Sequence, residues 1–334
     1  MSRRRAALAA VLIVTPVFAY GAASVVVWDK LSSVPNDCER KWGSNTPEAF
    51  TLSDPGILDT RPWAMPAPVE VRLPSRQAGI EIAGWWLPAI GPQSVASAPA
   101  VIVVHGFTAC RRDHDVLLPA GMLHRNGFSV LLIDLRDHGD STREDGRWAA
   151  GTDEYHDVLG AWDWLQAEQG IGPSAIGLVG ISLGAATSLL AAGQEPGIAA
   201  VWEDSSYADL GSAIDAELTR SGYPTILASG AVLTARLISG DDLVSYSPLD
   251  AALRLDGRPL FITHGTADTR VSVDYGHQLE AAVRAQGGNV ESWFVEGAEH
   301  TKALSTEPDE YERRLVDFFN RGLPWLRDAE PSSG

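Results

Sequence analysis

The sequence predicts an α/β protein built around a mostly parallel β-sheet with helices on both faces. Short apolar runs typical of buried strands alternate with segments whose apolar residues recur at helical spacing. Repeated strand–helix–strand units favour parallel pairing, because each crossover returns the chain to the same end of the sheet. Ala100–Val104 is the clearest strand, an uninterrupted apolar run that fits burial on both faces.

The composition is that of a folded, acidic protein. Of the 334 residues, 45% are hydrophobic and 21% are charged, so the chain has the apolar residues needed for a large core. The formal net charge of −17 at pH 7 repels polyanions at long range. We therefore expect no nucleic-acid partner and interpret the acidity as a property of a soluble surface.

The N-terminus predicts a membrane segment over residues 1–31. Three arginines, Arg3–Arg5, precede an uncharged run from Ala6 to Trp28. This run is longer than the core of a signal peptide and reaches the roughly 20 residues that span a bilayer. We expect an uncleaved anchor with the arginines inside and the rest of the chain exported. A cleaved signal stays open as an alternative, because small residues such as Ala22 could leave a cleavage site and Pro16 could break the helix.

Residues 32–68 read as a linker or as an irregular strap on the surface of the domain that follows. The segment is rich in Pro, Ser, Asn and Asp and lacks clear periodicity. It contains Cys38, one of two cysteines; the other is Cys110. No Cys-x-x-Cys pair exists, which excludes the common zinc and redox motifs. We expect two free thiols, with a single disulfide as the alternative if the domain lies outside the cytoplasm.

Residues 69–334 form the predicted catalytic domain. Its expected strands are Val69–Leu73, Ile80–Leu87, Ala100–Val104, Phe128–Asp134, Ala175–Ile181, Ile198–Trp202, Pro259–Thr263 and Val290–Val295. Its expected helices are Val116–Arg125, Thr152–Glu168, Leu183–Ala192, Val273–Ala285 and Pro308–Asn320. Residues 209–255 have helical patterning but no strand, so we interpret them as a helical lid over the sheet edge; an ordinary long crossover is the alternative.

A candidate nucleophile lies in the pentapeptide Gly180-Ile181-Ser182-Leu183-Gly184, which is a G-x-S-x-G motif. A serine hydroxyl becomes a good nucleophile only when a base takes its proton. The glycines permit a sharp strand-to-helix turn that exposes the serine at the top of a sheet. The predicted strand before Ser182 and the helix after it supply the context that this motif requires.

The partners of Ser182 follow two later strands. Asp268 lies just after Pro259–Thr263, and His300 lies just after Val290–Val295. Because the carboxyl ends of parallel strands meet at one edge, we expect both side chains beside Ser182, with His300 as general base and Asp268 as its orienting acid. The backbone N–H groups of Phe107 and Leu183 are the expected donors to the negatively charged oxygen of the intermediate.

Other residues of the same types compete for these roles. Asp204 also follows a strand and is the rival acid. We expect His105, His138 and His264 to brace loops rather than act as bases. No spacing resembles a metal site, and no G-x-G-x-x-G opens a helix after a strand, so we expect neither a metal nor a cofactor.

These motifs together resemble the α/β-hydrolase superfamily, and most of all its bacterial members similar to the catalytic domains of prolyl oligopeptidases and acylaminoacyl peptidases. The matching segments are His105–Phe107, Asp134–Ser141, Gly180–Gly184, His264–Val271 and Gly297–His300, within residues 69–322. The chain departs from the usual pattern at Asp137 and Glu299, where many relatives have glycine. The resemblance implies an eight-stranded, mostly parallel sheet and hydrolysis of an ester, thioester or amide.

We expect a membrane-anchored, extracytoplasmic serine hydrolase acting on small-molecule carboxylic esters. A peptidase acting on short peptides is the nearest alternative, disfavoured because no β-propeller stands ahead of the fold as a size filter. A hydrolase fold serving only as a binding module is a third possibility. Reaction with a fluorophosphonate probe discriminates it, because a module without an activated serine does not react.

Overall fold

A computed structural model describes residues 3–52, 58–90 and 98–323, with side chains described from residue 15 onward. Its centre is an eight-stranded sheet in the order β1-β2-β4-β3-β5-β6-β7-β8. The strands are β1 (Val69–Pro74), β2 (Glu81–Leu87), β3 (Ala100–Val104), β4 (Ser129–Ile133), β5 (Ile176–Ile181), β6 (Ala200–Asp204), β7 (Leu260–Gly265) and β8 (Val290–Val295). The strand β2 runs antiparallel to β1 and β4, and every other pairing is parallel. The predicted α/β-hydrolase fold class is confirmed.

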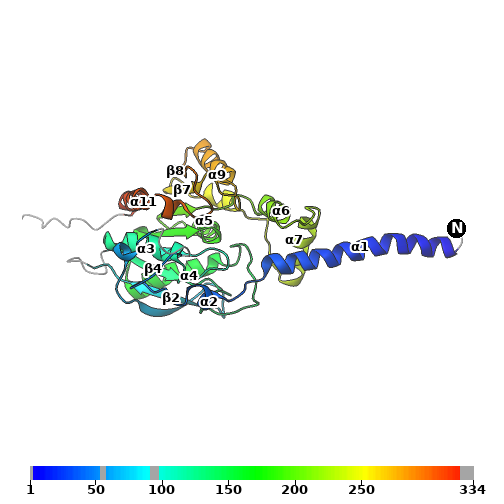
Figure 1. Ribbon diagram of the computed structural model, residues 1–334, viewed down its shortest axis with the longest axis horizontal. Helices are drawn as coiled ribbons and strands as arrows, with labels where there is room; N and C mark the ends of the chain where they lie inside the picture. Colours follow the sequence, from blue (N-terminus) through cyan, green and yellow to red (C-terminus); the bar gives the residue numbers. More distant parts are fainter. Residues whose placement is uncertain (1–2, 53–57, 91–97, 324–334) are drawn as a thin grey trace, which may run out of the picture.

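Helices cover both faces of this sheet (Figure 1). One face packs against α4 (Tyr155–Gln169), α5 (Leu183–Gln194), α8 (Pro248–Ala252) and α9 (Val273–Ala285). The other face packs against α3 (His114–Arg125), α10 (Ala303–Thr306) and α11 (Pro308–Gly322). Alternate residues of β3 divide between the two cores, Ile102 to the first and Val103 to the second, as the pleat of a strand buried on both sides requires.

The strand β6 differs from the expectation in its position. The sequence pattern places it over Ile198–Trp202, whereas the structure begins it at Ala200 and carries it to Asp204. The amide of Ile198 donates to the carbonyl of Glu195, so this residue belongs to the turn that precedes the strand. The shift brings Glu203 and Asp204 into the sheet, where both side chains are fully buried.

The segment between β6 and β7 is helical. It contains α6 (Leu210–Arg220), α7 (Leu227–Ile238) and α8; α7 lies beside the N-terminal helix α1 (Arg3–Ser32) and also contacts α6. Val27 and Trp28 of α1 form a small third core with Leu218 of α6 and Leu227 of α7. Tyr20 of α1 also reaches the domain, where its hydroxyl donates to the carbonyl of Ile226 at 2.9 Å. The N-terminal part of α1 projects away from the body (Figure 1).

The described residues 33–52 and 58–68 run over the surface of the domain, and they include a short helix, α2 (Cys38–Trp42), and a 3₁₀ turn (Arg61–Trp63). Phe50, Trp63 and Met65 are buried in the core that contains α3 and α11. These three side chains of the segment therefore belong to the hydrophobic core of the domain.

In the part of the chain that the structure describes, no helix has both the length and the apolar character needed to cross a membrane. The predicted anchor over residues 6–28 falls in part on residues 6–14, whose side chains lie outside the described part.

Candidate active site

Ser182 occupies a strained turn between β5 and α5. Its φ of 55° and ψ of −115° are rare for a residue with a side chain, and such strain is characteristic of functional positions. The turn is possible because the neighbouring residues lack a Cβ. A Cβ on Gly180 would lie 2.3 Å from the carbonyl oxygen of Gly184, and a Cβ on Gly184 would lie 2.2 Å from that of Val104. The two glycines of the motif are therefore steric requirements of the turn.

Ser182, His300 and Asp268 form a continuous hydrogen-bonded chain. The Oγ of Ser182 lies 2.9 Å from Nε2 of His300, and Nδ1 of His300 lies 2.7 Å from Oδ2 of Asp268. Because a carboxylate only accepts, Nδ1 carries the proton and Nε2 is free to accept from the serine hydroxyl. Ser182 directly follows β5, Asp268 lies after β7 and His300 lies after β8, so the three meet at the carboxyl edge of the sheet. This arrangement can activate a serine for attack on an acyl carbon.

The carboxylate of Asp268 is held in its charged form by its surroundings. Its Oδ1 accepts hydrogen bonds of 2.8 Å from the backbone amides of Arg270 and Val271. Its Oδ2 also faces Nε2 of His264 at 3.2 Å. Burial opposes the charge, but the hydrogen bonds from His264 and His300 outweigh it and hold the pKa of Asp268 well below its usual value. Asp268 therefore stays ionised and available to stabilise an imidazolium.

The two candidate oxyanion donors flank Ser182. Leu183 is the first residue of α5, where backbone N–H groups have no partner within the helix. Phe107 follows β3 in a loop that lies against the nucleophile, since a Cβ on Gly106 would lie 3.3 Å from Cβ of Ser182. The ring of Phe107 packs on Trp148, with centroids 4.7 Å apart. These positions suit donors aimed at an oxyanion that forms next to Ser182.

The rival residues have other partners. Asp204 accepts hydrogen bonds from the hydroxyls of Ser205 and Tyr311, and burial raises the pKa of Asp204 to about 6. His105 is fully buried, where its Nε2 accepts from the amide of Leu135 and its Nδ1 donates to the carbonyl of Gly106. These bonds brace the loop after β3.

Of the two departures from the usual family pattern, Asp137 has a clear conformational explanation. It adopts a φ of 62°, a conformation that glycine adopts at little cost. Its Oδ1 accepts from the amides of Glu144 and Gly146, and these bonds hold the loop together. The other departure, Glu299, is exposed beside His300.

The expectation of two free thiols is wrong, because Cys38 and Cys110 form a disulfide with their Cα atoms 6.0 Å apart. The sequence offers no signal for this pairing, since the two cysteines are 72 positions apart in the chain. The bond fastens α2 beside the loop that carries Phe107. It is reinforced by Lys41, whose ammonium donates to the carbonyl of Thr108 at 3.3 Å.

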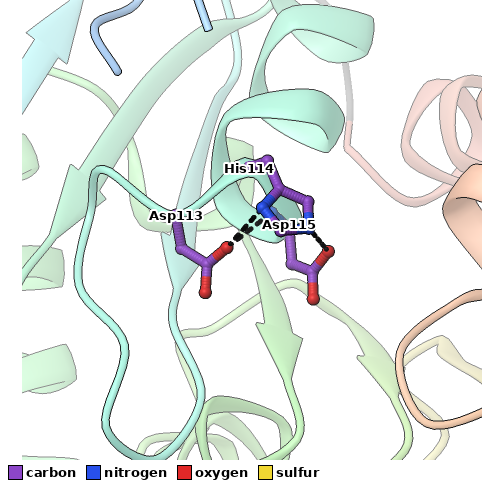
Figure 2. Close-up of side chains that lie close together, drawn as sticks. All are labelled: Asp113, His114 and Asp115. Atoms are coloured by element: carbon purple, nitrogen blue, oxygen red, sulfur yellow. Dashed lines mark hydrogen bonds and ion pairs between the residues drawn. The ribbon is translucent and has the colours of Figure 1, made fainter. Parts of the chain in front are cut away.

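A cluster that the sequence analysis passed over lies at the start of α3. Figure 2 shows the imidazole of His114 between the carboxylates of Asp113 and Asp115. Its Nδ1 lies 3.1 Å from Asp113 and its Nε2 lies 3.0 Å from Asp115. Burial opposes a charge on the ring, but the two carboxylates outweigh it and raise the pKa of His114. The three side chains are close enough to hold a metal ion. However, both ring nitrogens already face a carboxylate, so the arrangement fits a buried ion pair better.

Two cavities meet at Ser182. The larger, of about 500 Å³, is bordered by His300, Thr301, Asp113, Asp115 and Lys41. The smaller, of about 160 Å³, lies next to α1 and α6 and is bordered mostly by apolar side chains, among them Leu31, Leu210, Ala213 and Ile214. The linings include the predicted site residues Ser182, Phe107, Leu183 and His300. The other lining residues come from segments far apart in the chain, which no local sequence pattern connects.

The fold and this site define an α/β-hydrolase. Residues 119–324 match the prolyl oligopeptidase family, and the chain belongs to that family.

Curated relatives include hydrolases and proteins of unassigned activity. The chain is 35% identical over 99 residues to a thiohydrolase, AneE, of Aspergillus aculeatus, across 29% of this chain and 30% of that protein. It is 33% identical over 206 residues to an uncharacterized protein of Mycobacterium tuberculosis, across 62% of this chain and 64% of that protein. In both cases the alignment covers less than two thirds of the relative's own length.

Solved structures with the same fold include an esterase and a peptidase. The esterase Pf2001 of Pyrococcus furiosus superposes with a TM-score of 0.62 at 22% identity, over 80% of this chain and 96% of the esterase. The acylaminoacyl peptidase of Pyrococcus horikoshii superposes with a TM-score of 0.57 at 18% identity, over 78% of this chain and 42% of the peptidase. At these identities the likeness extends to the fold alone.

Proposed function

We propose that the protein is a carboxylic-ester hydrolase that works through an acyl-enzyme. The observation that carries the proposal is the hydrogen-bonded chain Ser182–His300–Asp268, with links of 2.9 and 2.7 Å. Ser182 Oγ attacks the acyl carbon as Nε2 of His300 takes its proton. The amides of Phe107 and Leu183 stabilise the negative oxygen that develops. His300 then gives the proton to the leaving group, and the bond between that group and the acyl carbon breaks. Water next attacks the acyl carbon as His300 takes its proton, and His300 returns that proton to Ser182 Oγ as the carboxylic acid leaves.

The test is loss of reaction at Ser182. A fluorophosphonate probe should label the wild-type protein and not Ser182→Ala, and Ser182→Ala should lower kcat on p-nitrophenyl esters by on the order of 10⁶. Unchanged circular dichroism would show that the variant is folded. Labelling of a correctly folded Ser182→Ala protein at the wild-type rate would contradict the assignment, and the absence of labelling in the wild type would favour a binding module.

A peptidase acting on short peptides is the second candidate, supported by membership of the prolyl oligopeptidase family. Amides are harder to cleave than esters because resonance stabilises the amide bond and an amine is a poorer leaving group than an alcohol. Amino-acid p-nitroanilides compared with p-nitrophenyl esters at equal concentration decide between the two. We expect ester turnover with no p-nitroanilide cleavage above that of Ser182→Ala, and efficient cleavage of a p-nitroanilide would establish the peptidase instead.

We also infer that the N-terminal segment holds the protein at a membrane with the catalytic domain outside the cytoplasm. Support comes from the uncharged run Ala6–Trp28 behind three arginines, and from the exposed side chains of Val17 and Phe18 on α1. The disulfide supports an oxidising compartment. We expect full-length protein in the membrane fraction and its catalytic domain open to protease from outside the inner membrane. Mass spectrometry of the mature N-terminus tests the alternative, in which a start near Ala22 would mean a cleaved signal.

A further inference from the structure

The two cavities at Ser182 differ in which catalytic groups they contain. Both are bordered by Ser182 and Phe107, but His300 and Thr301 border only the larger cavity. Leu183, whose amide is a candidate oxyanion donor, borders only the smaller one. This asymmetry assigns a direction to a bound substrate.

The direction follows from proton transfer. When the bond to the acyl carbon breaks, the leaving oxygen takes a proton from Nε2 of His300, so it must lie on the side of Ser182 that faces His300. That side is the larger cavity, where the carboxylates of Asp113 and Asp115 and the ammonium of Lys41 provide polar surroundings. The acyl chain then extends the other way, into the smaller cavity beside α1 and α6.

The N-terminal helix supplies part of the wall of this smaller cavity. Leu31, in the last turn of α1, borders it together with Ala213 and Ile214 of α6. Trp148 also borders this cavity and contacts two other residues of its wall, Leu31 and Phe107. Its Nε1 donates a 2.6 Å hydrogen bond to the carbonyl of Leu31, and its ring packs on Phe107.

The neighbouring Arg147 fixes the end of α1 to the domain. Its guanidinium forms an ion pair of 2.7 Å with Asp29 and donates to the hydroxyl of Ser32 at 2.9 Å. It also stacks over the ring of Trp28, 3.9 Å from the centroid. The C-terminal end of α1 is therefore held in a defined position beside the nucleophile.

We propose that the cavity between α1, α6 and Ser182 is the acyl site, that it takes a straight aliphatic acyl group of medium length, and that Leu31 of α1 sets its depth. The inference rests on the proposed ester hydrolysis. An apolar cavity of about 150 Å³ in a protein interior holds one benzene molecule, that is, about six carbons. At about 160 Å³, this cavity suits an acyl chain of similar size. Its charged lining residues, Lys30, Glu217 and Arg270, are not buried, so an aliphatic chain meets apolar walls inside.

The test is the chain-length profile of kcat/KM on p-nitrophenyl esters from acetate to palmitate. Each methylene that enters the site contributes up to about a fourfold gain, so we expect a rise from acetate to hexanoate or octanoate. Palmitate should fall well below the maximum because the cavity is then full. A flat profile, or a maximum at acetate or palmitate, would overturn the acyl site while ester hydrolysis itself stood.

Two variants locate the site. Ala213→Trp fills the cavity and should lower the hexanoate-to-acetate ratio of kcat/KM by at least tenfold, whereas Ala281→Trp, on the exposed surface of α9, should leave the profile unchanged. Leu31→Ala deepens the cavity and should move the maximum to a longer chain; Val26→Ala, on an exposed part of α1, is its control.

The variants also separate the two proposals. An unchanged ratio in Ala213→Trp or an unmoved maximum in Leu31→Ala would refute the acyl site and the role of α1, with the proposed function intact. Failure of the wild type to hydrolyse any ester or to react with the fluorophosphonate would refute the proposed function itself.

Discussion

The hydroxyl of Thr301 donates a hydrogen bond of 2.8 Å to Oδ2 of Asp115, which joins the residue after His300 to the first turn of α3. Thr301 has a φ of 57°, an unusual conformation for a residue with a branched side chain. Its amide also donates to Oγ of Ser205 at 3.3 Å. These contacts hold the loop that carries His300, and they link it to the ion pair of His114 with Asp115.

Removing this hydroxyl should therefore disturb the position of His300. We expect Thr301→Val to lower kcat on an ester at least tenfold with little change in KM, because small displacements of a catalytic group are costly. The rate of fluorophosphonate labelling should fall in parallel. Thr306→Val, an exposed threonine of α10, serves as the matched control. Equal kcat values for the two variants would show that the bond does not position His300.

The identity of the catalytic acid can be tested by two equivalent substitutions. Asp268→Asn should lower kcat by about 10⁴, because an amide favours the wrong tautomer of His300. Asp204→Asn should change kcat far less, since its carboxylate bonds to Ser205 and Tyr311 instead. Steady-state kinetics on one ester compare them, and the reverse order of effects would move the acid to β6.

The disulfide between Cys38 and Cys110 should contribute to stability. It closes a loop over a separation of 72 residues, for which the chain-entropy relation gives about 4 kcal/mol. We expect reductant, or replacement of both cysteines by serine, to lower the midpoint of thermal unfolding. Reductant should have no effect on the double variant, and an identical midpoint for reduced and oxidised wild type would contradict a stabilising role.

Because Glu203 is buried, we expect the free energy of unfolding to fall as the pH rises. Burial raises the pKa of Glu203 from 4.5 to about 8, and its Oε2 accepts from the amide of Ser206. In the unfolded chain the carboxyl group of Glu203 loses its proton above about pH 4.5. In the folded chain the same group keeps its proton up to about pH 8. The folded state thus binds more protons in this window, and the free energy of unfolding decreases between about pH 4.5 and 8.

Glu203→Gln should remove this dependence, because an amide does not ionise. The unfolding free energy of the variant relative to wild type should therefore increase from pH 5 to pH 8 by on the order of a few kcal/mol. Thermal midpoints of the two proteins at each pH measure this difference. Glu296→Gln, at an exposed position after β8, is the control. A difference that stays constant across this range would show that Glu203 is ionised in the folded protein.

The sequence alone determined the order of strands and helices along the chain and singled out Ser182, Asp268 and His300. These inferences depend on local patterns, such as apolar periodicity and the glycines around Ser182. One general rule then applies, that loops after parallel strands meet at one edge. The structure places the three side chains within hydrogen-bond distance, as that rule predicts.

Only the tertiary structure decided which distant segments touch. The pairing of Cys38 with Cys110, the bond from Thr301 to Asp115 and the place of Leu31 in a cavity beside Ser182 each join parts of the chain that lack any shared local pattern. Such contacts depend on how the helices pack on the sheet and how the N-terminal segments lie over it. Packing depends on the shapes of many side chains at once, whereas secondary structure is dominated by neighbours along the chain.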